Sequence, residues 1–292
     1  MNSGIGQSRY LVVGADSLIG GALVQRLSAA GKSVAATTRR RSGTAASIHL
    51  DLAEYADASA IPEDVSTAFL LAGITSISAC EADPEVSRRV NVTGTPALAR
   101  DLVSRGVHVV FASTNLVFDG SMPFAPPHHP VSPRSAYATQ KAEAETALLA
   151  TSRASVLRLS KVAETLHPLL TQWATDLAAG RTIHPFADRK CAPVSLDTVL
   201  DALILVGERR QPGIYQLCGT RDFTYAEIAS RLAAHMGVAV NAIQPVTSPE
   251  AASAAAHTTI ETSGLFAGSF TGRAEDALDP LFRSVMAHLS QP

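Results

Sequence analysis

Short apolar segments alternate with helix-like segments from Tyr10 to about Ser160. Several of the apolar segments are uninterrupted runs, which is typical of strands buried on both faces of a parallel sheet. This alternation predicts a doubly wound α/β fold, in which helices cover both faces of the sheet. The predicted strands are YLVVG (10–14), SVAATT (33–38), SIHL (47–50), TAFLLAG (67–73), HVVFAS (108–113) and SVLRLS (155–160). The predicted helices are 18–30, 84–105 and 135–151.

The second part of the chain has a looser pattern. Five prolines predict a loop at 119–134, whereas 244–275 has too little periodicity for a prediction. We expect residues 1–160 to form a dinucleotide-binding domain and residues 161–292 a smaller, lid-like α/β region that binds substrate, with some of its segments returning to the first domain. The further predicted elements are helices at 167–180, 195–208 and 224–236 and short strands near 182–186 and 213–218.

The composition favours a protein that binds a small molecule. Apolar residues make up 46% of the chain, charged residues 17%, and the formal net charge is -2, which exclude disorder and a strong attraction to nucleic acid. Cys80, Cys191 and Cys218 have neither the paired spacing of a zinc site nor the even count of a disulfide framework, so a reducing compartment is expected. The first ten residues do not resemble a signal peptide and no stretch is long enough to span a membrane, which predicts a cytoplasmic protein.

The segment GADSLIG directly follows the first predicted strand and opens the first predicted helix. At such a junction, backbone N–H groups and the positive end of the helix can bind the pyrophosphate of a dinucleotide. Gly14 permits the tight turn and Gly20 permits close packing of the helix. Ser17 takes the middle position, which is often glycine, and Leu18 and Ile19 complete the candidate cofactor turn. An ordinary strand-to-helix turn is the alternative interpretation.

The residues after the second predicted strand favour NADP over NAD. Proteins that bind NAD commonly place an acidic residue there to bind the ribose 2'-hydroxyl, whereas this chain has a Thr-Thr-Arg-Arg-Arg run that ends at Arg41. Arg39 and Arg40 can form charge-assisted hydrogen bonds with a 2'-phosphate. NADP(H) is therefore the expected cofactor and NAD(H) the second candidate. A solvated basic loop is the alternative interpretation of the arginines.

Two further strand ends offer candidate cofactor contacts. Asp51 and Leu52 follow the third predicted strand, where they could receive the adenine amino group. Leu71, Ala72 and Gly73 end the fourth predicted strand and are small enough to let the cofactor pass. Ordinary packing at the ends of strands explains these five residues equally well.

Tyr137 and Lys141 form the candidate catalytic pair. They are four residues apart on a predicted helix, so both side chains lie on one face. An adjacent ammonium and a positive nicotinamide favour the phenolate, which would let Tyr137 exchange a proton, while Lys141 binds the nicotinamide ribose. The fifth predicted strand leads into Ser113 and Thr114. We expect Thr114 to hydrogen-bond a developing alkoxide and Ser113 to act mainly as a cap.

Four motifs, GADSLIG, CEADPEVSRRVNVTGT, FASTNLVFDG and YATQK, together resemble the extended short-chain dehydrogenase/reductases. Within them the chain most resembles the dTDP-4-dehydrorhamnose reductase branch of sugar-nucleotide enzymes. The resemblance implies a Rossmann fold and NADPH-dependent reduction of a keto group on a nucleoside-diphosphate sugar. It implies Thr114, Tyr137 and Lys141 as the catalytic triad, Asn91 as a supporting residue, and a homodimer.

The chain departs from that branch where substrate would bind. The branch usually has Ser-Thr-Asp-Tyr before Val-Phe-Asp-Gly, whereas this chain has Asn115 and Leu116 at the last two of those four positions. We retain Asn91 and Asn115 as candidate substrate contacts, with Arg181 and Arg189 as candidates for binding phosphate. Solvated surface charge is the alternative interpretation of both arginines.

No metal site is expected, because the adjacent His128 and His129 lie in a proline-rich segment without further ligands at metal spacing. Trp173 is the only tryptophan, and we expect it to pack in the core.

Two competing functions stay open. One is a related epimerase or dehydratase that keeps NAD bound, against which the arginine run argues. The other is a nucleotide-binding regulatory subunit without turnover, since a fold does not determine a function. The intact Thr114, Tyr137 and Lys141 set argues against the regulatory subunit.

Overall fold

The computed structural model describes residues 9–40, 47–54, 58–249, 255–266 and 274–289, and of residues 274–276 only the backbone. The chain divides into two compact units, each assembled from separate segments. Unit 1 comprises Met1–Val117, Val131–Arg158 and Leu200–Tyr215. Unit 2 comprises Phe118–Pro130, Leu159–Val199 and Gln216–Pro292. The expected division at 160/161 stays a prediction about domains, because compact units need not fold independently.

Unit 1 is built on a seven-stranded sheet in the order β10-β6-β5-β4-β1-β2-β3. The strands from β5 to β3 pair in parallel, and the order reverses between β1 and β4, as in Rossmann folds. All six strands predicted in this part of the chain are present, which confirms the predicted fold class. The strands are β1 (Arg9–Val13), β2 (Val34–Thr38), β3 (Ser47–His49), β4 (Val65–Leu70), β5 (His108–Thr114), β6 (Ala154–Leu159) and β10 (Gly213–Leu217).

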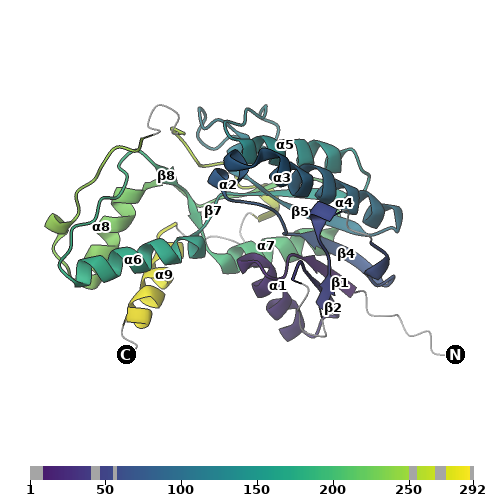
Figure 1. The fold of residues 1–292 in the computed structure, drawn as a ribbon, viewed down its shortest axis with the longest axis horizontal. Coiled ribbons are helices and arrows are strands. Elements are labelled where there is room, and N and C mark those ends of the chain that lie inside the picture. Colours follow the sequence, from purple (N-terminus) through teal and green to yellow (C-terminus); the bar gives the residue numbers. More distant parts are fainter. Residues whose placement is uncertain (1–8, 41–46, 55–57, 250–254, 267–273, 290–292) are drawn as a thin grey trace. The chain divides into compact units, whose positions relative to one another are not determined.

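Helices flank this sheet on both faces: α3, α4 and α5 lie on one face and α1 and α7 on the other (Figure 1). The predicted helix at 84–105 is continuous but contains a π-helical turn, Arg89–Gly94, between α3 and α4. Ser17 and Ser135 begin α1 and α5 by accepting backbone N–H groups of the first turn. The helices are α1 (Leu18–Ala29), α2 (Ile77–Ala82), α3 (Pro84–Arg88), α4 (Thr95–Ser104), α5 (Ala136–Leu149) and α7 (Leu196–Arg209).

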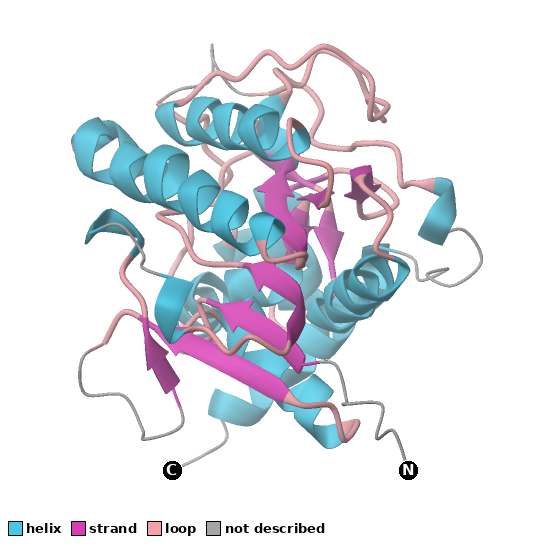
Figure 2. Ribbon diagram, turned by 90° about the vertical axis from the view of Figure 1, so that its right-hand side faces the viewer, coloured by secondary structure: helices cyan, strands magenta, loops and turns pink. Residues whose placement is uncertain are grey.

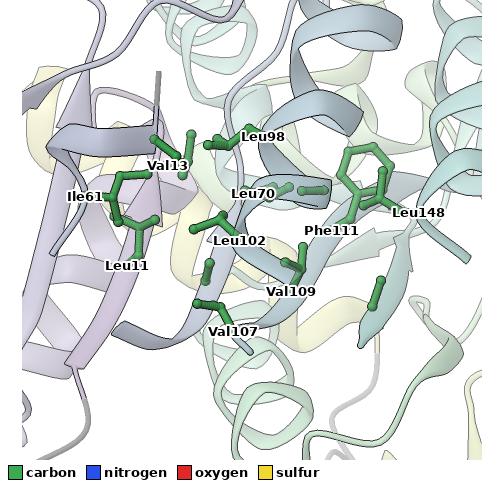
Figure 3. Close-up of a cluster of buried hydrophobic side chains, with 14 of the residues drawn as sticks. Leu11, Val13, Ile61, Leu70, Leu98, Leu102, Val107, Val109, Phe111 and Leu148 are labelled. Atoms are coloured by element: carbon green, nitrogen blue, oxygen red, sulfur yellow. The ribbon is translucent and has the colours of Figure 1, made fainter. Parts of the chain in front are cut away.

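The core of unit 1 lies between the central strands and the helices α4 and α5. Side chains from β1, β4 and β5 meet Leu98 and Leu102 of α4 and Leu148 of α5 (Figure 3). Leu102 and Leu148 are fully buried, and each such side chain contributes about 1.5–3 kcal/mol relative to exposure. The continuous apolar runs in the sequence therefore reflect strands that are covered on both faces.

Figure 2 draws strands in magenta and helices in cyan, and the strands most visible in it belong to the sheet of unit 1. Unit 2 is built mainly from helices, with two pairs of very short strands. Its core gathers side chains of α6, α8 and α9, and Trp173 packs in it as expected. The predicted strand at 182–186 is wrong, because this segment makes only isolated bridges, from Ile183 and Phe186. The elements are α6 (His167–Ala178), α8 (Tyr225–Met236), α9 (Ala274–Leu289), β7 (Lys161–Val162) paired with β9 (Pro193–Val194), and β8 (Lys190–Cys191) paired with β11 (Phe223–Thr224).

The sequence reasoning missed α2 and α9. The buried residues of α9, Leu278, Leu281, Phe282 and Val285, follow a helical spacing that could have revealed it. The loop predicted at 119–134 has no helix or strand, apart from one isolated bridge at Ala125. Among the helices that the structure describes, none is both long and apolar enough to cross a membrane.

Candidate active site

The glycine turn between β1 and α1 brings the start of α1 against the ends of β1 and β4. Gly14 has φ +92°, and a Cβ there would lie 2.7 Å from the backbone nitrogen of Ala72, so only glycine fits. A Cβ on Gly20 would lie 2.2 Å from the carbonyl oxygen of Gly14. Ser17 joins both glycines, since its hydroxyl donates to Gly14 O at 2.8 Å and accepts from Gly20 N at 3.0 Å. Leu18 and Ile19 therefore start α1 directly beside this turn.

The segment Leu71–Gly73 lies beside the same turn. The N–H of Leu71 donates to Val13 O at 3.0 Å, which extends the pairing of β4 with β1. A Cβ on Gly73 would lie 3.0 Å from Oδ1 of Asn91. The structure thus brings together three predicted cofactor residues, the glycine turn and Asn91.

The end of β2 is tied to the glycine turn. The N–H groups of Gly14 and Ala15 donate to Oγ1 and the carbonyl oxygen of Thr37, at 3.2 and 3.1 Å. The hydroxyl of Thr38 donates to the carboxylate of Asp16, a residue that the sequence reasoning missed. That reasoning looked for an acid only after the second strand, whereas Asp16 comes from the turn after the first.

Arg39 and Arg40 follow β2 directly and are exposed. The backbone N–H of Arg40 donates to Oγ1 of Thr38 at 3.0 Å. Arg41 lies outside the described residues.

Asp51 and Leu52 already have contacts within the protein. Oδ1 of Asp51 accepts the N–H of Ala53 at 2.9 Å. Leu52 is buried, and a Cβ on Gly94 would lie 1.9 Å from its carbonyl oxygen. Packing against the π-helical turn therefore accounts for Leu52 without a cofactor.

Thr114, Tyr137 and Lys141 meet at the carboxyl end of β5. All three are buried, and the hydroxyl of Tyr137 is hydrogen-bonded to the side chain of Thr114. Nζ of Lys141 donates to Ala112 O at 2.7 Å and lies 4.2 Å from the centre of the Phe111 ring. The strand end and the helix face predicted from the sequence thus form one cluster.

Burial dominates the ionisation of this cluster. It raises the pKa of Tyr137 to about 12, although the hydrogen bond from Thr114 acts in the opposite direction. It also lowers the pKa of Lys141 to about 8, against the attraction of the Glu145 carboxylate. In the protein without a cofactor, desolvation of the phenolate therefore keeps Tyr137 protonated, and the expectation that an ammonium and a bound nicotinamide together favour the phenolate stays a prediction.

A buried ion pair lies behind the cluster. Arg158 on β6 and Glu145 on α5 are 2.7 Å apart and almost fully buried. The hydroxyl of Ser113 donates to Glu145 at 2.5 Å, so Ser113 is not the expected cap. Instead Oγ1 of Thr114 accepts the N–H of Leu116 at 3.2 Å. The sequence reasoning missed both Glu145 and Arg158, since only the packing of α5 on the sheet brings them together.

The buried side chain of Asn91 ties the segment after β4 to α5. Its Oδ1 accepts the N–H of Ile74 at 3.0 Å, and its Nδ2 donates to Ile74 O and to Gln140. Asn115 lies at the end of β5, where the Thr114 hydroxyl reaches its Oδ1 at 3.4 Å. Asn91 therefore supports the site through the backbone, in keeping with the supporting role that the resemblance implied.

The two candidate phosphate contacts belong to unit 2. Arg181 forms an exposed ion pair with Asp176, at 2.6 Å. Arg189 lines a hollow of about 270 Å³, whereas Arg181 does not line it. The other lining residues are Leu169, Trp173, His184, Pro185, Phe186 and Tyr225.

Within the described ranges, no group of three or more His, Cys, Asp or Glu side chains is placed to hold a metal ion. The ring of His129 packs 5.5 Å from that of Phe118. The absence of a metal site stays a prediction.

The sheet order, the glycine turn and the Tyr137/Lys141 cluster define an extended short-chain dehydrogenase/reductase. Residues 8–264 match the family described as the RmlD substrate binding domain, and the chain belongs to that family.

Sequence relatives and solved structures agree with this assignment. The chain is 29% identical over 214 residues to a probable dTDP-4,6-dihydroxy-2-methyloxan-3-one 4-ketoreductase of Streptomyces antibioticus, covering 71% of this chain and 69% of that one. It is 28% identical over 169 residues to a dTDP-4-dehydrorhamnose reductase of Sinorhizobium fredii, covering 54% and 57%.

Among solved structures, MoeE5 in complex with UDP-glucose and NAD has a TM-score of 0.81 at 22% identity, covering 97% of this chain and 100% of that one. A dTDP-4-dehydrorhamnose reductase from Bacillus anthracis in complex with NADP has a TM-score of 0.77 at 18% identity, covering 95% and 98%. At such identities the structural likeness supports the fold.

Proposed function

We propose that this protein is an NAD(P)H-dependent reductase of a keto group on a nucleoside-diphosphate sugar. The observation that carries the proposal is the buried cluster of Thr114, Tyr137 and Lys141 at the carboxyl end of β5. β1, β4 and β5 are parallel neighbours, so the glycine turn and this cluster lie at the same edge of one sheet. Ligands of open α/β sheets bind at that edge.

The residues present fit a dinucleotide. Gly14 permits the close approach of the turn to Ala72 that a Cβ would block, and the first two N–H groups of α1, which have no acceptor inside the helix, suit a pyrophosphate. Arg39 and Arg40 suit a 2'-phosphate, which makes NADP(H) the first candidate and NAD(H) the second. When bound, the nicotinamide would supply a hydride.

The side chains of the cluster supply the proton and the orientation. With a pKa of about 12, Tyr137 is a phenol at neutral pH and holds the proton that the carbonyl oxygen needs as its carbon accepts hydride. The hydroxyl of Thr114 stabilises the negative charge that develops on that oxygen. Lys141 binds the nicotinamide ribose, and its positive charge assists the loss of the phenol proton.

Two observations support a sugar nucleotide as the substrate. The relatives named above are a ketoreductase and a reductase of dTDP-linked sugars by their names. The hollow in unit 2 offers Phe186 and Tyr225 for contact with a base and Arg189 for a phosphate, the chemistry that a nucleoside diphosphate requires.

The proposal is tested by fluorescence titration of the purified protein with NADPH and NADH, followed by turnover with a dTDP-linked 4-keto-6-deoxy sugar. We expect stoichiometric oxidation of the reduced nucleotide. Tyr137→Phe should lower kcat by about two orders of magnitude or more while leaving nucleotide binding intact. The matched control is Tyr215→Phe, because the hydroxyl of Tyr215 is exposed and bonds to Gln211 O.

Each alternative has its own result. If the sugar is isomerised or dehydrated without net oxidation of the reduced nucleotide, the protein is an epimerase or a dehydratase and not a reductase. Nucleotide binding without any turnover would favour a regulatory subunit. Failure of the wild type to bind either nucleotide would rule out every function that requires a nicotinamide cofactor.

A further inference from the structure

Asp16 places a carboxylate at the end of β2, although it belongs to the turn after β1. The parallel pairing of Val13 with Thr37 sets the two strand ends side by side. The hydroxyl of the buried Thr38 then donates to the carboxylate of Asp16, which is itself exposed. The acid is therefore anchored on β2 with its charge at the surface.

In dinucleotide-binding folds, the end of this strand meets the 2' position of the adenosine ribose. An acid there accepts a hydrogen bond from the 2'-hydroxyl of NAD and repels the 2'-phosphate of NADP. A carboxylate has acceptor capacity for several donors, so accepting from Thr38 does not prevent it from accepting from a ribose.

We propose that Asp16 is a specificity-determining residue that favours NADH over NADPH. This inference rests on the proposed function, since it requires that a nicotinamide dinucleotide binds at the glycine turn. The segment that follows β2 contains no acidic residue, and Asp16, from the turn after β1, takes the place of that acid.

The arginines at the same strand end act in the opposite direction. Oγ1 of Thr38 donates to Asp16 and accepts the backbone N–H of Arg40, so one hydroxyl connects the acid with the basic segment. Arg39 and Arg40 are exposed and attract a 2'-phosphate, while Asp16 repels it. The selectivity of the protein is set by the balance of these charges, and neutralising Asp16 leaves the arginines unopposed.

The test is isothermal titration of NADH and NADPH into the wild type and Asp16→Asn. Asparagine keeps an oxygen acceptor for the Thr38 hydroxyl and removes only the charge, and the exposed position tolerates the change. We expect the ratio of NADPH to NADH affinity to rise by about tenfold. The matched control is Glu63→Gln, an exposed acid that precedes β4 and so lies at the opposite edge of the sheet.

A ratio that stays within about twofold of the wild type would overturn the inference. An equal loss of affinity for both nucleotides would also overturn it, because that result would show that Asp16 maintains the shape of the turn and does not distinguish the 2'-hydroxyl from the 2'-phosphate. Neither result touches the proposed function, which is tested separately by nucleotide binding and turnover of the wild type.

Discussion

At the scale of single residues, burial of the charged Lys141 side chain lowers the stability of the folded protein. It is buried against Phe111 with a pKa of about 8, well below its ordinary value of 10.5. Below pH 8 both the folded and the unfolded chain carry the charge, and the folded state bears its desolvation. Between pH 8 and 10.5 the unfolded chain binds more protons, so the stability of the folded state rises with pH.

We therefore expect Lys141→Met to gain stability relative to the wild type at pH 7 and to lose that advantage as the pH approaches 10. The change in the difference between the two proteins is up to about 3 kcal/mol. Urea unfolding at both pH values measures it. Lys32→Met is the matched control, since Lys32 is largely exposed and pairs with Glu208 at 3.8 Å. A difference that did not depend on pH would contradict the burial argument.

The Tyr137 phenol shows the limit of reasoning from neighbours along the helix. The spacing of Tyr137 and Lys141 on one helical face was predictable, and α5 confirms it. The direction in which the pKa of Tyr137 shifts was not predictable, because it depends on how deeply α5 packs against β5, and the spacing of residues along a helix does not reveal that depth.

At the scale of elements, the turn between β1 and α1 depends on a glycine at position 14. We expect Gly14→Ala to destabilise the fold by about 2–4 kcal/mol, because it combines a positive φ with a contact of 2.7 Å to the Ala72 backbone. Nucleotide binding should be lost with it.

Gly31→Ala is the control for this substitution, since Gly31 has φ +70° and a Cβ added there would have no heavy atom outside its immediate chain neighbours within 4 Å. It should cost only about 1–2 kcal/mol, the price of the backbone conformation alone. Thermal unfolding separates the two contributions, and equal losses for the two variants would show that the approach of Ala72 adds nothing.

The predicted elements of unit 1 were found because apolar runs and helical spacing are local signals. The strand predicted at 182–186 is absent because its pairing is not a local property. Ile183 and Phe186 make only single bridges, to Ile243 and Val246, which lie about 60 residues further along the chain. A β-strand is stabilised by partners that lie far away in sequence, and Pro185 has no N–H to offer them.

At the scale of the whole molecule, unit 1 is completed by segments that come late in the chain. Leu203 and Val206 of α7 are fully buried, and a Cβ on Gly207 would lie 2.6 Å from the Phe69 ring of β4. β10 pairs with β6 at the end of the sheet.

We therefore expect the fragment 1–160 to lack a cooperative thermal transition, although it contains the predicted dinucleotide domain. Removing α7 exposes Phe69, and removing β10 leaves β6 as an unpaired edge. Circular dichroism on heating, with the full chain as the reference, provides the measurement. A sharp two-state transition in the fragment would show that residues 1–160 fold on their own.

The alternation of strands and helices, the glycine turn and the Tyr137/Lys141 face were predictable from the amino-acid sequence, because each depends on residues that are close together along the chain. Asp16 meets Thr38, and Ser113 and Arg158 meet Glu145, only because separate segments of the chain pack together in the folded protein. Periodicity and spacing fix which face a side chain is on. Which charge it meets there, and how much water it keeps, depends on which distant segments pack against that face.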